Sequence, residues 1–282
     1  MRAMIVAAGL GTRLKPLTDS IPKALVPVAG KPLLEHVIGK LVAAGVTEIV
    51  INVHHFPEQI IQFVKENKDF GVKIHFSDET DQLLETGGGI RKARKWLEGK
   101  PDTTTELTIA NTEPADDYWD GSEQCPQVEN TSNMLNTGDP FLVHNVDILS
   151  NLDTAALLAQ HQRSQPLATL VVSERETLRY FLFDDDNRLR GWTNLKTGEV
   201  KPVTLIHPER YRKLAFSGIQ VLSPAIFKLM ESWPERFSIT DFYLENLYDH
   251  TILGYVQPDY RMIDVGKPGS IEAASQFLND NM

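Results

Sequence analysis

The first hundred residues alternate short apolar runs with helix-like patterns, and this alternation restricts the chain to few folds. Two runs, residues 3–7 (AMIVA) and 48–53 (EIVINV), are strand-length and largely apolar. Between them, residues 32–44 place apolar side chains at helical spacing, with Pro32 suited to the first turn and Gly45 to the stop. Strand alternating with helix predicts a parallel sheet with right-handed crossovers. We therefore predict an α/β fold, a Rossmann-like, mostly parallel sheet with helices on both faces.

The same two patterns continue through the rest of the chain. They predict further helices at residues 57–67, 88–98, 224–231, 241–249 and 268–279. They predict further strands at residues 72–77, 140–146, 167–172, 180–184, 188–192 and 214–222. Ligands of such sheets bind beyond the carboxyl ends of the strands. The loop that follows residues 3–7 is therefore in the expected place for a ligand.

Residues 101–139 interrupt this pattern. They are rich in Thr, Asn, Asp and Pro with little periodicity, and we interpret them as a long, acidic, surface-exposed insertion. Residues 101–162 contain no Lys or Arg and eleven Asp or Glu, whereas the rest of the chain has 28 basic and 27 acidic residues. Because the acidity is local and no basic stripe is visible, we expect no nucleic-acid partner. A few cations focused in one cleft can still bind phosphates.

The sequence shows no membrane or secretion signal. No run of 18 or more apolar residues occurs, so no membrane span is expected. The apolar stretch near Met1 is too short for a secretory signal, and the single cysteine, Cys125, cannot form an internal disulfide. We therefore expect a cytoplasmic protein without a membrane partner.

The loop after the first strand reads AAGLGTRLKPLT over residues 7–18. Gly9 and Gly11 allow backbone N–H groups to approach phosphate oxygens closely, and Arg13 and Lys15 add positive charge beside them. A dinucleotide-binding loop would have a third glycine where Leu14 stands, and a P-loop would end in Gly-Lys-Ser/Thr, which is missing. The loop therefore predicts a phosphate-binding site that is neither a dinucleotide-binding loop nor a P-loop.

Two sequence elements resemble those of the sugar nucleotidyltransferases. Residues 6–18 (VAAGLGTRLKPLT) resemble the G-x-G-T-R-x-x-P-L-T element of that family. Residues 22–32 (PKALVPVAGKP) resemble its P-K-x-L-x-P-V element at the usual spacing. The resemblance implies a fold of the nucleotide-diphospho-sugar transferase type. It also implies that the nucleotide is bound by Ala8, Gly9, Gly11, Thr12, Arg13 and Lys23, the last two acting on the phosphates.

Two aspartates resemble the metal-binding positions of the family: Asp147 follows the predicted strand 140–146, and Asp264 ends the segment YRMID at residues 260–264. Residues 145–147 (Asn-Val-Asp) resemble its N-x-D or G-D element, and residues 263–266 (IDVG) resemble its later D-x-G element. The resemblance implies that Asp147 and Asp264 hold the metal, with Asn145 at the nucleotide. Because a triphosphate carries about four negative charges and a sugar 1-phosphate nearly two, bringing them together requires cations. Mg²⁺ accepts one or two carboxylates together with phosphate oxygens, so we expect Mg²⁺ as the cofactor.

A third glycine-rich segment, residues 84–89 (LETGGG), resembles the base-reading loop of the family. Glycines at such a loop would let the backbone approach a base edge. We expect Glu85, Thr86, Gly87 and Gly88 to contribute to nucleotide binding. The sugar site should come from the second half of the chain, where the candidates are Arg179, Asn194, Ser217 and Gly218.

The resemblance implies a single domain over residues 1–282. Residues 1–175 would mainly bind nucleotide, with the insertion 101–139 among them, and residues 176–282 would mainly bind sugar and supply a C-terminal helix. The implied reaction joins a nucleoside triphosphate to a sugar 1-phosphate and releases pyrophosphate.

The expected substrates follow the subfamily that the chain resembles most. Its short length is most similar to that of N-acetylmuramate 1-phosphate uridylyltransferases, which use UTP. Mannose-1-phosphate guanylyltransferases, which use GTP, are the alternative. A non-catalytic protein that binds a sugar nucleotide and regulates a partner, and an interaction role for the acidic insertion, also remain open. The sequence does not predict an oligomeric state.

Overall fold

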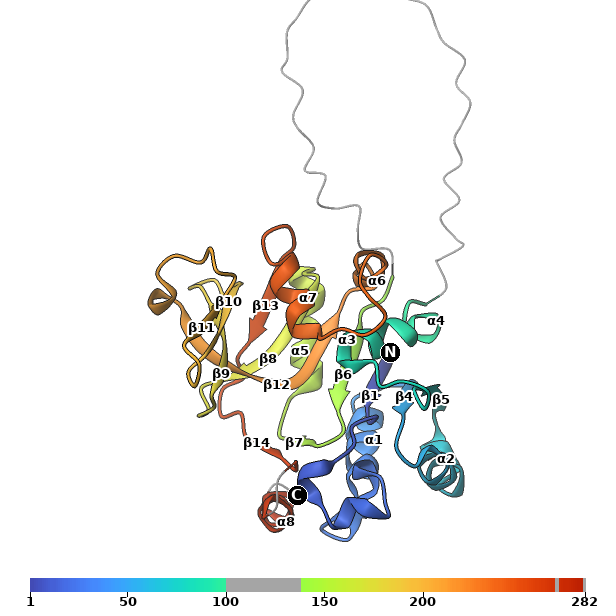
Figure 1. The fold of residues 1–282 in the computed structure, drawn as a ribbon. Coiled ribbons are helices and arrows are strands. Elements are labelled where there is room, and N and C mark those ends of the chain that lie inside the picture. Colours follow the sequence, from blue (N-terminus) through green and yellow to red (C-terminus); the bar gives the residue numbers. More distant parts are fainter. Residues whose placement is uncertain (100–137, 267–268, 281–282) are drawn as a thin grey trace, which may run out of the picture.

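The computed structural model describes residues 1–99, 138–266 and 269–280, so nearly all of the predicted insertion 101–139 lies outside it. The described chain forms a ten-stranded mixed sheet with helices on both faces (Figure 1). The main path through the sheet runs β11-β10-β9-β12-β6-β1-β4-β5, and β8 and β13 branch from β12. The predicted α/β fold is thereby confirmed.

One half of the sheet is parallel, as the alternation of the first hundred residues predicts. The strands β1 (Arg2–Val6), β4 (Glu48–Val53), β5 (Lys73–Asp78) and β6 (Phe141–Asn145) run side by side in one direction. Their carboxyl ends therefore meet at one edge, where the loop of residues 7–18 begins.

The second half of the chain adds mainly antiparallel pairing. The long strand β12 (Arg212–Leu222) pairs antiparallel with β6, β8 (Ala168–Ser173) and β9 (Arg179–Phe183). The strands β10 (Leu189–Asn194) and β11 (Glu199–Lys201) extend this side antiparallel, whereas β13 (Ile252–Tyr255) is parallel to β8. A separate pair, β7 (Ile148–Ser150) and β14 (Met262–Asp264), lies beyond the carboxyl end of β6.

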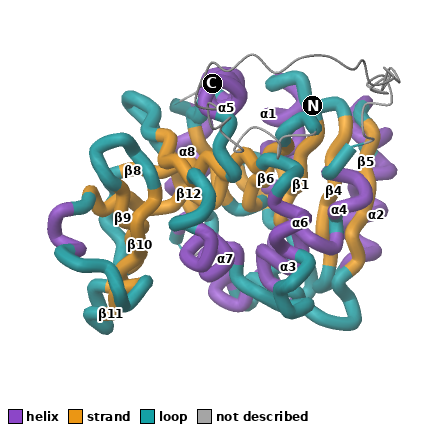
Figure 2. Tube along the Cα trace, turned by 90° about the horizontal axis from the view of Figure 1, so that it is seen from above, coloured by secondary structure: helices purple, strands orange, loops and turns teal. Residues whose placement is uncertain are grey.

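Helices cover both faces of the sheet because its strands send alternate side chains to opposite sides. Figure 2 shows α1 (Leu33–Ala43) and α5 (Thr154–Ser164) on one side, and α3 (Glu85–Lys92), α6 (Ile226–Met230) and α7 (Ile239–Asn246) on the other. In β1, Met4 belongs to the core under α3 and α7, whereas Ala3 and Ile5 belong to the core under α1 and α2 (Pro57–Glu66). None of the helices in the described ranges combines the length and the apolar content that crossing a bilayer requires.

A smaller third core joins the two ends of the chain. The helix α8 (Ser270–Asn279) contributes Ala274, which is buried against Val26 and Val265. The hydroxyl of Ser275 accepts a hydrogen bond from the backbone N–H of Ala29 at 3.1 Å. Figure 1 shows α8, β14 and the N-terminal loop segment together at the lower end of the molecule. The segment after the glycine loop is thus fixed by the last described helix.

The predicted element boundaries differ from the structure at a few places. The helix predicted at 88–98 is two helices, α3 and α4 (Arg94–Leu97), and α3 begins three residues earlier, at Glu85. The predictions omit the helix α5, although Asp153 caps it by accepting a hydrogen bond from the Ala156 N–H at 2.9 Å. They also omit the short strands β7, β11 and β13, because three or four residues give too little periodicity.

His161 predicts a loss of stability in acid. Its side chain on α5 is 2% exposed, with Nδ1 2.9 Å from the Thr169 hydroxyl, and burial lowers the pKa from 6.5 to about 4. The unfolded chain therefore binds a proton at His161 at higher pH than the folded chain does. The stability that the neutral, buried His161 contributes is complete above pH 6.5 and is lost as the pH falls towards 4. The loss should reach about 3 kcal/mol.

Urea unfolding at about pH 7, 5.5 and 4 measures this effect. The free energy of unfolding of His161→Gln should depend less steeply on pH than that of the wild type. Equal pH dependence in the two proteins would contradict the assignment to His161.

Candidate active site

The glycine loop begins where β1 ends, and its shape is fixed by remote side chains. The N–H groups of Ala7 and Ala8 donate to the Asn52 side-chain oxygen at 2.7 and 3.3 Å. Gly11 has φ of +64°, and a Cβ there would stand 2.9 Å from the methyl carbon of Thr18. Gly9 has nothing within 4 Å of its Cβ position, so protein packing does not require glycine there. An open position in an exposed loop leaves room for a ligand.

Four charged side chains converge beside this loop. The Lys23 ammonium forms an ion pair with the Asp147 carboxylate, and both groups are largely buried. A Cβ on Gly266 would stand 2.6 Å from Asp264 Oδ1, 2.8 Å from Arg13 Nη2 and 3.2 Å from Lys23 Nζ. Gly266 therefore leaves open the point on which Arg13, Lys23 and Asp264 converge.

Backbone pairing brings the two aspartates together from distant parts of the chain. Asp264, the last residue of β14, is in register with Ile148 of β7, which directly follows Asp147. The Val265 N–H donates to the Asp147 carbonyl oxygen at 2.8 Å. The two carboxylates and the two cations thus form one charged cluster beyond the carboxyl ends of the parallel strands.

The two carboxylates fit a hard cation such as Mg²⁺. Asp264 Oδ1 is buried, and within the described residues it has no hydrogen-bond partner, although a buried carboxylate oxygen normally has one. The missing side chain of Gly266 leaves space next to this oxygen. The described ranges hold no cluster of three or more His, Cys, Asp or Glu side chains suited to a metal. Two carboxylates alone are compatible with Mg²⁺, because this ion keeps waters and phosphate oxygens as further ligands.

The segment predicted to read the base owes its glycines to packing. A Cβ on Gly87 would overlap the Phe237 ring, and one on Gly88 would overlap the Glu235 carbonyl oxygen. The N–H groups of Gly87 and Gly88 also donate to the Phe237 carbonyl oxygen, at 3.1 and 3.4 Å. These two glycines therefore allow α3 to lie against residues 235–237.

At the start of α3, the backbone takes a conformation that side chains rarely adopt. Glu85 has φ of +61°, and its exposed carboxylate pairs with Arg236 at 3.0 Å. A non-glycine residue with this φ is strained and is most common at functional sites. Thr86 follows it as a partly buried residue of the first turn. Residues 85–86, rather than Gly87 and Gly88, are thus the part of this segment that is available to a ligand.

The sugar candidates form two separate groups. Ser217 is buried, and Gly218 has φ of +75°, with a Cβ position 2.6 Å from the side-chain nitrogen of Asn145. This group therefore adjoins Asn145 at the end of β6, two residues before Asp147. Arg179 and Asn194 form the second group, directly opposite each other on β9 and β10.

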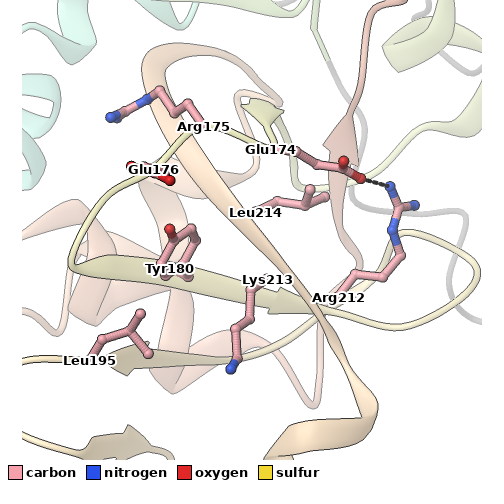
Figure 3. Close-up of a pocket in the computed structure, with 8 residues that line it drawn as sticks. All are labelled: Glu174, Arg175, Glu176, Tyr180, Leu195, Arg212, Lys213 and Leu214. Atoms are coloured by element: carbon pink, nitrogen blue, oxygen red, sulfur yellow. Dashed lines mark hydrogen bonds and ion pairs between the residues drawn. The ribbon is translucent and has the colours of Figure 1, made fainter.

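A hollow of about 370 Å³ lies beside the second group, lined by residues of β9, β12 and the segment before β9 (Figure 3). In Figure 3, Arg212 pairs with Glu174, whereas Arg175 points away from this pair. Arg175 donates to the Phe216 carbonyl oxygen at 3.0 Å, next to Ser217. Sequence reasoning missed Arg175, although it contacts the backbone of the residue before Ser217.

Sequence reasoning missed two further residues, which hold the backbone of the glycine loop and of the start of α3. Asn52 near the end of β4 and Glu79 just after β5 are 2% and 0% exposed. They are hydrogen-bonded to each other at 2.7 Å. The only sequence signal was their place at the carboxyl ends of adjacent parallel strands.

Comparisons with known proteins show what the chain is similar to. The family model described as nucleotidyl transferase matches residues 2–281. N-acetylmuramate alpha-1-phosphate uridylyltransferase of Caulobacter vibrioides is 41% identical over 50% of this chain and 64% of its own length. Probable mannose-1-phosphate guanylyltransferase 1 of Oryza sativa subsp. japonica is 28% identical over 95% of this chain and 62% of its own length. The chain thus spans less than two thirds of these relatives.

Solved structures share the fold. HddC from Yersinia pseudotuberculosis complexed with GMP-PN has a TM-score of 0.69 and 21% identity, covering 98% of this chain and 99% of that one. A putative glucose-1-phosphate thymidylyltransferase from Bacillus anthracis has a TM-score of 0.72 and 16% identity, covering 99% of this chain and 96% of its own. Because the family model matches nearly every residue of the chain, the chain belongs to the nucleotidyl transferase family.

Proposed function

We propose that the protein transfers a nucleoside monophosphate from a nucleoside triphosphate to a sugar 1-phosphate and releases pyrophosphate. The observation that carries this proposal is the convergence of Arg13, Lys23 and Asp264 on the open point beside Gly266, with Asp147 paired to Lys23. Cations and carboxylates gathered in one cluster suit a reaction between two anions. A purely structural ion-pair network would not need the open point.

In the proposed reaction, an oxygen of the sugar phosphate attacks the α-phosphorus in line. The new P–O bond forms as the bond from the α-phosphorus to the bridging oxygen breaks, and pyrophosphate leaves with that electron pair. Because the attacking oxygen is already ionised, no general base is needed. Catalysis then consists of positioning and charge stabilisation.

The side chains have distinct roles in this scheme. Arg13, exposed at the loop, would stabilise the leaving pyrophosphate, and Lys23 would neutralise charge on the reacting phosphates. Asp147 and Asp264 would hold Mg²⁺, which when bound neutralises phosphate charge. The amides of Gly9–Thr12 would contact the phosphates, and Asn145 with Glu85 and Thr86 would contact the nucleoside.

We propose UTP and N-acetylmuramate 1-phosphate as the substrates. The support is the 41% identity to the Caulobacter vibrioides protein named for that reaction. The alternative, GTP with mannose 1-phosphate, is supported by relatives named for it that match 95% of the chain. Whichever pair is used, the reaction produces a sugar nucleotide.

A substrate panel tests the proposal. The purified protein is incubated in Mg²⁺ with UTP, GTP, ATP or dTTP, each combined with N-acetylmuramate, N-acetylglucosamine, mannose or glucose 1-phosphate, and pyrophosphate is measured. UTP with N-acetylmuramate 1-phosphate should be fastest. A maximum with GTP and mannose 1-phosphate would favour the alternative. No pyrophosphate from any pair would favour the non-catalytic, regulatory protein.

The same panel distinguishes two cations for an acidic sugar. Arg179 lies on β9 opposite Asn194, whereas Arg175 contacts the backbone next to Ser217. If Arg179 binds the acidic group, Arg179→Ala should lose the preference for N-acetylmuramate over N-acetylglucosamine 1-phosphate by roughly tenfold, since a charge-assisted bond contributes more than about 1 kcal/mol. The same loss in Arg175→Ala alone would assign the role to Arg175.

A further inference from the structure

Two segments of the proposed nucleotide site, the glycine loop and the start of α3, are joined by one buried pair of polar side chains. We propose that Asn52 and Glu79 are positioning residues that hold these two segments at the separation spanned by one nucleotide. The inference rests on the proposed function, since it assigns the phosphates to one segment and the base to the other. Neither residue is exposed enough to touch a substrate directly.

The first half of the link fixes the glycine loop. Asn52 projects from β4 beside β1, and its side-chain oxygen accepts both the Ala7 and Ala8 N–H groups. These are the first two amides after the strand. Because Ala8 directly precedes Gly9, the direction in which the loop leaves the sheet depends on this one oxygen.

The second half fixes the start of α3. Glu79 Oε1 accepts from the Asn52 side-chain nitrogen at 2.7 Å, and Oε2 accepts from the Leu84 N–H at 3.1 Å. Leu84 is the residue immediately before α3. Gly89 of α3 lies directly over the pair, since a Cβ there would stand 2.7 Å from Glu79 Oε1 and 3.2 Å from the Asn52 nitrogen.

Burying the polar side chains of Asn52 and Glu79 costs free energy, so the pair is not an efficient way to stabilise a fold. Glu79 is completely buried, and among the described residues no Lys, Arg or His side chain forms an ion pair with it. Apolar residues of similar volume would usually serve stability equally well or better. Polar groups, unlike apolar ones, fix direction and distance between named backbone atoms. The arrangement therefore suits positioning.

The donors and acceptors of the link allow a reversal test. In Asn52→Asp, two carboxylates face each other. In Glu79→Gln, either two NH₂ groups face each other or the Leu84 N–H loses its acceptor. In the double variant, the carboxylate at position 52 still accepts from Ala7 and Ala8 and also accepts from the new amide nitrogen at position 79, whose oxygen accepts from Leu84. All hydrogen bonds of the link are therefore restored in the double variant, and only the bond between positions 52 and 79 changes its direction.

The experiment measures KM for UTP and for the sugar 1-phosphate in the wild type, both single variants and the double variant. Each single variant should raise KM for UTP roughly tenfold or more, because a buried polar group is left unpaired, with KM for the sugar phosphate changed less than about threefold. The double variant should return to within about threefold of the wild type. Asn67→Asp, the same chemical change at an exposed position, is the control and should change neither KM.

Several outcomes would overturn the proposal. These are an unchanged KM for UTP with only a lowered melting temperature, a parallel rise in both KM values, or a double variant no better than the singles. If these variants unfold, Gly89→Ala is tested in their place. Its added methyl group displaces the Glu79 carboxylate without changing any polar group, so this variant should also raise KM for UTP selectively.

A failure of the proposed function is recognised separately, from the wild type. A wild type that releases no pyrophosphate is examined by calorimetry with Mg²⁺-UTP and Mg²⁺-GTP. Binding weakened in the singles and restored in the double variant would still support the link. An absence of nucleotide binding would overturn the link together with the function.

Discussion

Replacing Asp147 by Asn should reduce the rate of pyrophosphate release by roughly 10²–10³-fold at saturating substrates. The substitution keeps the shape of the side chain and removes one of the two carboxylates beside the open point at Gly266. It also leaves the ammonium of Lys23, whose side chain is 10% exposed, without its carboxylate. Pyrophosphate release over a range of Mg²⁺ concentrations measures the effect, and the ion requirement should shift to higher concentration.

Asp153→Asn provides the matched control. Asp153 follows β7 and caps α5, and Asn is an equally good cap, so neither activity nor melting temperature should change. Turnover of Asp147→Asn within about threefold of the wild type, with the control also active, would refute the role of this carboxylate.

Replacing Lys23 by Met should have an effect of similar size, roughly 10²–10³-fold on turnover. Methionine keeps an unbranched chain of similar length and removes the charge. In the substrate-free protein, the change leaves the Asp147 carboxylate, whose side chain is 17% exposed, without its cation. Removing one partner of a largely buried pair also destabilises the fold, so the free energy of unfolding should fall by about 2–4 kcal/mol.

Turnover and urea unfolding of the Lys23→Met variant measure the two effects separately. The comparison is Lys15→Met, in the same segment but with an ion pair to Asp19 whose side chains are more than half exposed. That pair should contribute little, so both measurements should stay near wild type. Equal losses in the two variants would show that positive charge in the loop, rather than the position of Lys23, matters.

The sequence predicts the parallel half of the fold well, because strands buried on both faces are continuously apolar and helices carry one apolar stripe. IVINV of β4 and the stripe of α1 are examples. The helix α5 is absent from the predictions although the N-cap Asp153 and the run AALLAQ are visible in the sequence. Short strands such as β7 acquire their structure from pairing with β14, which no local pattern reveals.

For the site, local motifs predict which residues matter but not always why. Gly11 is needed for its φ and for the contacts of Thr18 and Lys23, as a phosphate loop would suggest. Gly87 and Gly88 are needed because residues 235–237, far along the chain, pack against them. A contact of such long range cannot be inferred from spacing.

Asn52 and Glu79 cannot be selected from the sequence. Single polar residues after strands are common, and only the register of β1, β4 and β5 brings these two together. Conversely, Arg179 is a candidate because of its charge, and the structure leaves it on β9 opposite Asn194.

The main path of the sheet ends in two outer strands, β5 and β11, that affect how the molecule meets its neighbours, and β13 ends a side branch. The outer strand β5 carries Lys73 and His75, both bonded to Glu48, and β11 carries Glu199 and Lys201. An edge strand has unpaired backbone N–H and C=O groups that can pair with a strand of a second chain, and charged side chains along the edge oppose this pairing. Strand addition at β5 and β11 should therefore be disfavoured, and any self-association should proceed through other surfaces.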